Sequence, residues 1–174
     1  YTSSCGFVAG LNLVRSKGIE VFLQCLKNLH DEDVDYRARI VGAEYDVSIA
    51  EVQKFNQENG ISDRVEVLGP LYGKEKENIL WSSDIMVLPS FNDAFPLTVL
   101  EGMQAGLVVV SSDNGALPEM VEDGKTGFVV AVQDVKVMTE KIKILCTNED
   151  RRKSMAEAAK QKFEMNYTIE KFEQ

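Results

Sequence analysis

Two carboxylates, Asp93 and Glu101, flank a proline and a short apolar run in the segment PSFNDAFPLTVLEGM, residues 89–103. If a helix begins with Pro96 as its first residue, Glu101 lies about one turn inside it and Asp93 lies in the preceding loop. The first backbone amides of such a helix, here those of Leu97, Thr98 and Val99, have no partner within it, and together with the helix dipole they favour an anion such as a phosphate. The segment therefore predicts an anion site at the helix start, with Glu101 beside it.

Structural roles are the alternative for both carboxylates. An acidic residue just before a helix is commonly a cap, but with Pro96 first the capping position falls on Phe95, and Asp93 precedes that position by two residues. Asn92 and Asp93 could instead form a turn of their own. Glu101 could lie on a solvated helix face, although its neighbours in sequence are mostly apolar. Spacing alone leaves structural and functional roles open for both acids.

A second candidate site lies in the loop NLVRSKG, residues 12–18, which follows the first apolar run. Lys17 falls just before a predicted helix that begins at Ile19, so its ammonium group can neutralise a phosphate as a point charge. An exposed loop lysine without a function is the alternative, because no short motif identifies Lys17. The functional role gains support if the Lys17 loop and the Asp93 loop, both compatible with a phosphate, lie at the same edge of a sheet.

Several common sites are missing from the sequence. No GxGxxG follows the first apolar run and no GxxxxGK[ST] occurs, which argues against a dinucleotide fingerprint and a P-loop. The single histidine, His30, lies in the polar segment NLHDED, where a surface role is expected, so a Ser-His-Asp or Cys-His arrangement is poorly supported. The three cysteines, Cys5, Cys25 and Cys146, are widely spaced, which argues against a disulfide framework or a zinc site. Cys25 falls on an apolar helix face and is expected to be a buried thiol.

Length and composition indicate one compact globular domain. The chain has 174 residues, of which 44% are apolar and 27% are charged. The net charge of −9 argues against a nucleic-acid binder, because binding to the phosphate backbone requires clustered Lys and Arg. No apolar run approaches the ~20 residues that a membrane span requires. The chain begins at Tyr1 without Met, and we expect a cytoplasmic protein and a piece of a longer one.

Short apolar runs and segments of helical period alternate along the chain. The runs have the length of buried strands and cover residues 6–13, 36–42, 65–69, 84–90, 107–112 and 126–132. The predicted helices cover residues 19–29, 47–59, 74–83, 97–105 and 117–124, and then 135–148, 151–166 and 168–174. This alternation predicts an α/β fold with an open parallel sheet of about six strands and helices on both faces. Ligands of such sheets bind beyond the carboxyl ends of the strands.

The order of these segments resembles one family. The chain is similar to the C-terminal half of the retaining GT-B glycosyltransferases of family 4, also called group 1. The segments that carry the similarity are KG near the start, IVG, VLGPL and the long block DIMVLPSFNDAFPLTVLEGMQAGLVVVSSDNGALPEMVEDGKTGFVV. The resemblance runs from about Val8 to the closing segment FEMNYTIEKFEQ. It implies that residues 1–174 form a single Rossmann-like domain that binds a nucleotide sugar, with C-terminal helices at about 135–174. An N-terminal domain that carries most of the acceptor site is then absent from this chain.

The resemblance also implies roles for individual residues. The family signature is a glutamate, seven residues and a second glutamate, and here Asp93 and Glu101 occupy it. Glu101 is implied to hydrogen-bond the ribose hydroxyls, and Asp93 to stand near the reacting carbon of the donor sugar. Lys17 matches the phosphate-neutralising lysine of the family. The residues implied to line the sugar and diphosphate are Ala94, Phe95, Pro96, Leu97 and Thr98.

Recognition of the base is implied to come from the loops after the second and third strands. These loops are residues 42–45 and 69–72, and they include Gly42 and Leu71. Because the contacts are partly to the backbone, residue types discriminate weakly between bases, and we favour a UDP-sugar over a GDP-sugar. The family needs no metal and no further cofactor at this site.

The sequence departs from the family pattern at three positions. The arginine that usually lies five residues before the lysine, as a second phosphate cation, is here Asn12, and Arg15 falls elsewhere in the pattern. The first acid is Asp93, one methylene shorter than glutamate. Val108 replaces the usual proline after Gly106. These changes leave open a weakened donor site or an unusual donor.

The resemblance implies a hexosyltransferase that moves a sugar with retention onto a saccharide or lipid-linked acceptor, in the synthesis of a surface polysaccharide or glycolipid. The isolated domain is expected to bind nucleotide and to transfer poorly. Contact with the inner face of a membrane, if any, is expected through the missing half. One alternative is a nucleotide-sugar-binding or scaffold domain with impaired catalysis, and another is a GT-B sugar-nucleotide epimerase.

Overall fold

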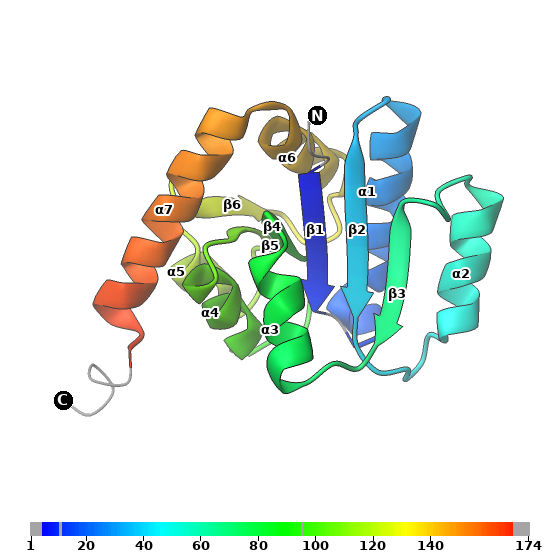
Figure 1. The fold of residues 1–174 in the computed structure, drawn as a ribbon, viewed down its shortest axis with the longest axis horizontal. Helices are drawn as coiled ribbons and strands as arrows, with labels where there is room; N and C mark the ends of the chain where they lie inside the picture. Colours follow the sequence, from blue (N-terminus) through cyan, green and yellow to red (C-terminus); the bar gives the residue numbers. More distant parts are fainter. Residues whose placement is uncertain (1–4, 11, 95, 169–174) are drawn as a thin grey trace.

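A single parallel sheet forms the centre of the molecule (Figure 1). The computed structural model describes residues 5–10, 12–94 and 96–168. In this part of the chain six strands pair in the order β3-β2-β1-β4-β5-β6, and every pair is parallel. The strands are β1 (Cys5–Gly10), β2 (Tyr36–Val41), β3 (Val65–Gly69), β4 (Ile85–Leu88), β5 (Val108–Ser112) and β6 (Gly127–Val130). The predicted open sheet of about six strands is confirmed.

Helices cover both faces of this sheet, as predicted. They are a short 3₁₀ turn η1 (Arg15–Lys17), α1 (Ile19–Asp31), α2 (Ile49–Glu58), α3 (Gly73–Trp81), α4 (Leu97–Gln104), α5 (Leu117–Met120), α6 (Val135–Thr147) and α7 (Glu149–Asn166). Phe7 of β1 belongs to the apolar cluster formed with α1 and α6, whereas its neighbour Val8 belongs to the cluster formed with α3, α4 and α5. α7 contributes Met155 to the first cluster and Ala159 to the second. The sheet is therefore buried from both sides.

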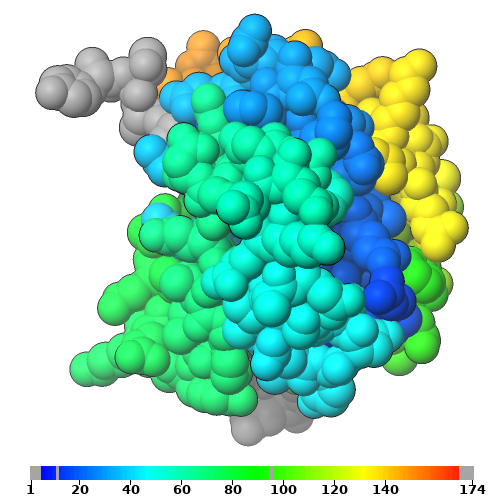
Figure 2. Space-filling model, turned by 90° about the vertical axis from the view of Figure 1, so that its right-hand side faces the viewer, coloured from blue at the N-terminus to red at the C-terminus, as the bar shows by residue number. Residues whose placement is uncertain are grey.

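The pattern of apolar residues explains why these elements form. β4 (IMVL) and β5 (VVVSS) are buried along their whole length, which is typical of central parallel strands covered on both faces. α1 buries residues at helical spacing, among them Ile19, Phe22, Leu26 and Leu29. At the edge of the sheet formed by β3, α2 lies beside this strand, and Figure 2 shows the molecule from this side. Covering an edge strand protects its unpaired backbone groups.

Three predicted boundaries were wrong or fall outside the described residues. The helix predicted at 117–124 ends after one turn, because Val121 takes an extended backbone with φ −109° and ψ 117°. The first strand ends at Gly10 rather than at residue 13, and Leu13 turns into the core with an isolated bridge to Glu44. The helix predicted at 168–174 lies outside the described residues except for its first position.

Two sequence predictions on single residues have clear outcomes. Cys25 is fully buried on α1, and burial raises the pKa of its thiol to about 11, which confirms the prediction of a buried core thiol. His30 lies at the end of α1 and is half-buried, with its Nδ1 atom buried, so the predicted surface position is met only in part. Among the described helices none is both long and apolar enough to cross a membrane.

Candidate functional site

A cavity of about 460 Å³ opens at the carboxyl ends of the central strands. The strand order reverses between β1 and β4, and the cavity is lined by the last residues of both strands, Gly10 and Leu88, and by Val41 at the end of β2. Its volume falls in the range of small-ligand sites, and its place is the one at which open α/β sheets bind ligands. The other lining residues are Asn12, Lys17, Gly42, Pro70, Leu71, Tyr72, Lys76, Asp93, Pro96, Leu97 and Thr98.

The structure brings most of the predicted site residues together around this cavity. Those that line it are Asn12, Lys17, Gly42, Leu71, Asp93, Pro96, Leu97 and Thr98. Ala94 is not among the lining residues, and its carbonyl oxygen accepts a hydrogen bond from the Ala116 N–H at 3.2 Å. Phe95 lies outside the described residues. Glu101 lines an adjoining cavity, as described below.

Lys17 and Asp93, the two predicted catalytic residues, form an ion pair in the wall of the cavity. The Lys17 Nζ atom lies 2.8 Å from Asp93 Oδ2 and also donates to the carbonyl oxygen of Asn92 at 3.2 Å. The side chains retain 31% and 17% of their exposure, so both are accessible from the cavity. The cation and the carboxylate therefore share one end of the site, and a bound anion would compete with Asp93 for Lys17.

The segment that carries Asp93 is held from two sides. The Phe91 N–H donates to the carbonyl oxygen of Ser16 in η1 at 3.1 Å. The Asp93 N–H donates to Asn114 Oδ1 in the loop after β5, also at 3.1 Å. The backbone that carries the Asp93 carboxylate is therefore positioned by contacts with elements far away in sequence.

Two glycines allow these close approaches. Gly18 has φ +81°, and a Cβ atom there would lie 2.2 Å from the Pro89 carbonyl oxygen. Gly115 has φ +56°, and a Cβ atom there would lie 1.9 Å from the Asp93 carbonyl oxygen. The segment from Pro89 to Ala94, here called the Asp93 segment, is therefore approached by Gly18 and by Gly115. At both positions the left-handed backbone and the close contact require a residue without a side chain.

The start of α4 differs from the prediction in one respect. Pro96 is the capping residue and not the first helical residue, because its ψ of 101° keeps it extended and the helix begins at Leu97. Its carbonyl oxygen accepts a hydrogen bond from the Val99 N–H at 3.0 Å, so this amide is not free for a ligand. Among the described groups neither the Leu97 nor the Thr98 amide has a partner. Val99 is therefore excluded from the three predicted amides, and those of Leu97 and Thr98 remain candidates for an anion, since both residues line the cavity.

Glu101 lies one turn into α4, at the second cavity of about 410 Å³. Its Oε2 atom is 2.5 Å from the Lys76 Nζ atom of α3. Oε2 is buried, and it accepts no hydrogen bond from the described residues. The contact with Lys76 is therefore an ion pair that lacks the angles of a hydrogen bond. Sequence reasoning missed Lys76, because no motif marks it and only the packing of α3 beside α4 brings it to Glu101.

Asn12 holds two loops together at the place where the family has an arginine. Its Oδ1 atom accepts a hydrogen bond from the Ala43 N–H at 3.1 Å, and the Leu13 N–H donates to the Ala43 carbonyl oxygen at 2.8 Å. The loop after β2 is also joined to the last residue of β3, because the Gly42 N–H donates to the Gly69 carbonyl oxygen at 2.8 Å. Asn12 therefore lines the cavity as a neutral group that is already engaged with the backbone.

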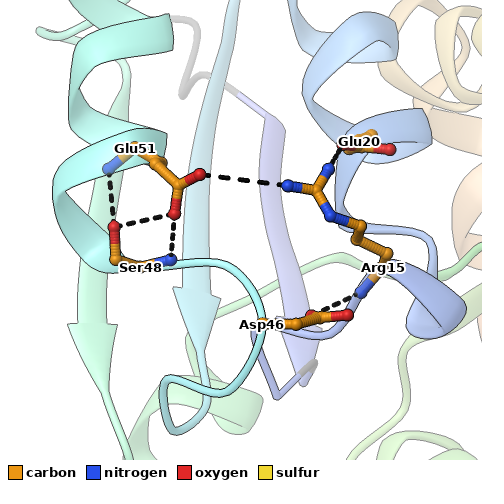
Figure 3. Close-up of polar contacts among 5 residues, drawn as sticks. All are labelled: Arg15, Glu20, Asp46, Ser48 and Glu51. Atoms are coloured by element: carbon orange, nitrogen blue, oxygen red, sulfur yellow. Dashed lines mark hydrogen bonds and ion pairs between the residues drawn. The ribbon is translucent and has the colours of Figure 1, made fainter.

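Arg15 does not supply the missing cation. Figure 3 shows its guanidinium group between Glu20 of α1 and Glu51 of α2, and its backbone N–H donates to Asp46 Oδ1 at 3.0 Å. Arg15 is absent from the residues that line the cavity. The structure thus agrees with the sequence pattern, in which Arg15 falls away from the phosphate positions.

The capping box of α2 supports this network and leads to a first prediction. The Ser48 Oγ atom accepts from the Glu51 N–H at 3.1 Å, and Glu51 Oε2 accepts from the Ser48 N–H at 2.7 Å. We expect Ser48→Ala to lower the free energy of unfolding at pH 7 by about 1 kcal/mol, measured by urea denaturation. Ser154→Ala, at an exposed position within α7, is the matched control and should change stability by no more than about 0.5 kcal/mol.

The effect of Ser48→Ala should depend on pH. Hydrogen bonds from Ser48 hold the pKa of the Glu51 carboxyl below its ordinary value of 4.5. A lowered pKa in the folded state means that the carboxylate stabilises the fold above the ordinary value, and that this contribution is lost as the pH falls through the folded pKa. Ser48→Ala keeps the backbone hydrogen bond to Glu51 and removes the one that Ser48 Oγ donates to Glu51 Oε2 at 2.9 Å. The part of the destabilisation that comes from this side-chain bond should therefore disappear in acid below that pKa, and a loss that is independent of pH would show that Ser48 Oγ acts only as the acceptor for the Glu51 N–H.

Comparison with known proteins identifies a family. The sequence model described as glycosyl transferases group 1 matches residues 7–162. D-inositol 3-phosphate glycosyltransferase of Corynebacterium urealyticum is 32% identical over 161 residues, which cover 90% of this chain and 38% of that protein. The corresponding enzyme of Corynebacterium aurimucosum is 31% identical over 163 residues, with 91% and 38% covered. The chain thus spans less than half the length of these relatives.

Solved structures of other transferases share the fold of this chain. The C-terminal domain of a glycosyl transferase group 1 family protein from Francisella tularensis matches with a TM-score of 0.86 at 20% identity, and the match covers 95% of this chain and 87% of that chain. The pneumococcal O-GlcNAc transferase GtfA, solved in complex with UDP and GlcNAc, matches with a TM-score of 0.85 at 20% identity, over 97% and 34% of the two chains. At these identities the likeness is one of fold.

Proposed function

The chain belongs to the group 1 glycosyltransferases and has the fold of their C-terminal GT-B domain, and from this premise we propose that it binds a nucleoside diphosphate sugar for transfer with retention. The observation that supports the proposal best is the single cavity that gathers Lys17, Asp93 and the start of α4 at the reversal of the strand order. A cation, a carboxylate and free amides are what a sugar diphosphate requires at its reacting end.

Lys17 and the start of α4 act on the leaving group in this proposal. When the bond between the sugar carbon and the diphosphate oxygen breaks, the electron pair goes to the diphosphate and positive charge develops on the sugar. The Lys17 ammonium and the Leu97 and Thr98 amides then meet more negative charge than in the ground state, so they stabilise the transition state preferentially. Lys17 exchanges its contact with Asp93 for the diphosphate.

Asp93 and Glu101 act on the two sugars of the donor. Asp93 stands beside Lys17 at the cavity end where the reacting carbon would lie, and its carboxylate can face the developing positive charge. Glu101 accepts hydrogen bonds from the ribose hydroxyls, and to do so its carboxylate exchanges the Lys76 ammonium for the ribose. The donor thus extends from the larger cavity towards the smaller one.

We favour UDP as the nucleotide and propose that a second domain, not contained in these 174 residues, binds most of the acceptor. The fold of this chain is shared with transferases that were solved with UDP, among them the pneumococcal enzyme. The acceptor would be a saccharide or a lipid-linked molecule in polysaccharide or glycolipid synthesis, and it would face the donor cavity from that domain. The 174-residue chain alone should therefore bind the donor and transfer sugar poorly.

Calorimetric titration with UDP, GDP and their sugars tests the proposal. We expect the 174-residue chain to bind a uridine nucleotide, and at a ligand concentration 100-fold above Kd the fold should be stabilised by about 2.7 kcal/mol. Glu101→Ala should weaken binding by about tenfold or more, because hydrogen bonds to a charged group are lost. Glu140→Ala, an exposed glutamate on α6, is the control and should bind like the parent chain. Failure of the parent chain to bind any of these nucleotides would overturn the proposal.

A nucleotide-sugar-binding domain with impaired catalysis is the second candidate. It is favoured by Asn12, whose amide oxygen is engaged with Ala43 where a phosphate cation is usual, and by the short side chain of Asp93. The two candidates differ in the full-length protein. Binding of a nucleotide sugar together with transfer supports the enzyme, whereas binding without transfer to any acceptor supports the second candidate.

A further inference from the structure

The cavity has an unusual distribution of charge. Its lining contains two cations, Lys17 and Lys76, and one carboxylate, Asp93. Lys17 is already paired with Asp93 at 2.8 Å, and Asn12 is neutral. A diphosphate bound here would therefore meet little net positive charge from Lys17 and Asp93 alone. Besides the partial charges at the start of α4, Lys76 is the remaining cationic side chain among the described lining residues.

Lys76 occupies the boundary between the two cavities. It is the one described residue that lines both the cavity of about 460 Å³ and the cavity of about 410 Å³. The first of these contains the start of α4, with Leu97 and Thr98, and the second contains Glu101. The Lys76 side chain is 33% exposed, so its ammonium is accessible to a ligand in either cavity.

We propose that Lys76 binds the phosphate next to the ribose and so supplies the second cation that Asn12 does not. The inference rests on the proposed function, in which the ribose lies on Glu101 and the diphosphate lies at Lys17 and the start of α4. A nucleotide in this orientation places its ribose-linked phosphate between the two cavities, where Lys76 lies. The donor site is thus completed by a lysine from α3 instead of by a cation from the loop after β1.

Binding of the nucleotide replaces the ion pair between Lys76 and Glu101 by one new contact for each of the two side chains. In the described structure the Lys76 ammonium and the Glu101 carboxylate hold each other at 2.5 Å without hydrogen-bond geometry. On binding, the ribose hydroxyls donate to Glu101, and the phosphate accepts from Lys76. Both members of the ion pair then regain a partner of suitable charge or hydrogen-bonding type, so no charged group is left without one.

The test compares UDP, UMP and uridine by calorimetry on the parent chain and on Lys76→Gln. UMP carries the ribose-linked phosphate and uridine does not. The substitution should therefore lower the affinity for UDP and for UMP by about tenfold and leave the affinity for uridine unchanged. The dependence of UMP affinity on salt should also become shallower. Trp81, the single tryptophan, lines the smaller cavity, and its fluorescence provides a second readout of binding.

Two further variants separate a direct contact from an indirect one. Lys74→Gln removes an exposed lysine from the same helix, outside both cavities, and should have no effect on any of the three ligands. If Lys76 acted only by holding Glu101 in place, Lys76→Gln would lower the affinity for uridine. In a Glu101→Gln background the same substitution would then cause no further loss of UMP affinity. A direct phosphate contact predicts that the loss of UMP affinity persists in that background.

The outcomes distinguish this inference from the proposed function. If the parent chain binds UMP and Lys76→Gln, with an unchanged melting temperature, binds it equally well, the role of Lys76 is wrong and the donor site stands. If uridine and UMP are weakened equally, Lys76 serves the ribose and the inference is also wrong. If the parent chain binds no nucleotide, the proposed function fails, and the inference fails with it.

Discussion

Replacing Lys17 by methionine in the full-length protein is expected to lower the rate of sugar transfer by roughly 10²- to 10³-fold, the cost of removing one charge-stabilising donor from an active site. The reason is the position of its ammonium at the cavity end that also holds Asp93 and the start of α4. Negative charge grows there on the departing diphosphate. Initial rates of transfer from a UDP-sugar, with acceptor in excess, measure the effect.

Controls separate the chemistry of Lys17 from its structural contact. Lys54→Met removes an exposed lysine from α2 and should leave the rate unchanged. Lys17→Met also deprives Asp93 of its partner. Because Asp93→Asn is itself expected to lower the rate, the coupling between the two substitutions in a double-mutant cycle shows how much of the Lys17→Met loss comes from an uncompensated carboxylate. Transfer at the parent rate by Lys17→Met would refute the role of the ammonium. Transfer at the parent rate by Asp93→Asn would refute the role of the carboxylate.

Gly115→Ala is expected to destabilise the fold by about 2–4 kcal/mol and to abolish tight nucleotide binding. A Cβ atom at this position would lie 1.9 Å from the Asp93 carbonyl oxygen, a backbone atom that can move only together with its segment. The strain of a side chain at φ +56° adds about 1 kcal/mol to the cost of the overpacking, which is about 1–3 kcal/mol. Urea denaturation measures the stability, and titration with UDP measures the site.

Gly124→Ala is the matched control for this substitution. Gly124 has φ +78° in the loop before β6, and a Cβ atom there would meet nothing within 4 Å. It should cost about 1 kcal/mol from the backbone alone and should leave nucleotide affinity unchanged. Equal destabilisation by the two variants would show that the approach of Gly115 to Asp93 has no energetic consequence. Normal UDP binding by Gly115→Ala would show that the Asp93 segment does not need this position.

The amino-acid sequence determined the architecture because the relevant signals are local. Apolar runs such as IMVL at 85–88 and VVVSS at 108–112 are long enough for buried strands and too short for helices, and the helical segments between them require parallel crossovers. The same alternation brings the loops after the strands to one edge, so the loops holding Lys17 and Asp93 were expected there. Their meeting at one cavity follows from topology.

The tertiary structure alone decided how these groups are paired. Asn12 binding Ala43, Lys17 meeting Asp93 and Lys76 meeting Glu101 are contacts between loops or helices far apart in sequence. The start of α4 was misjudged by one residue, since the backbone angle of Pro96 depends on the segment that enters the helix. Sequence periodicity reports which face of an element is buried, whereas the partner of a polar side chain depends on how separate elements pack, and no local pattern carries that information.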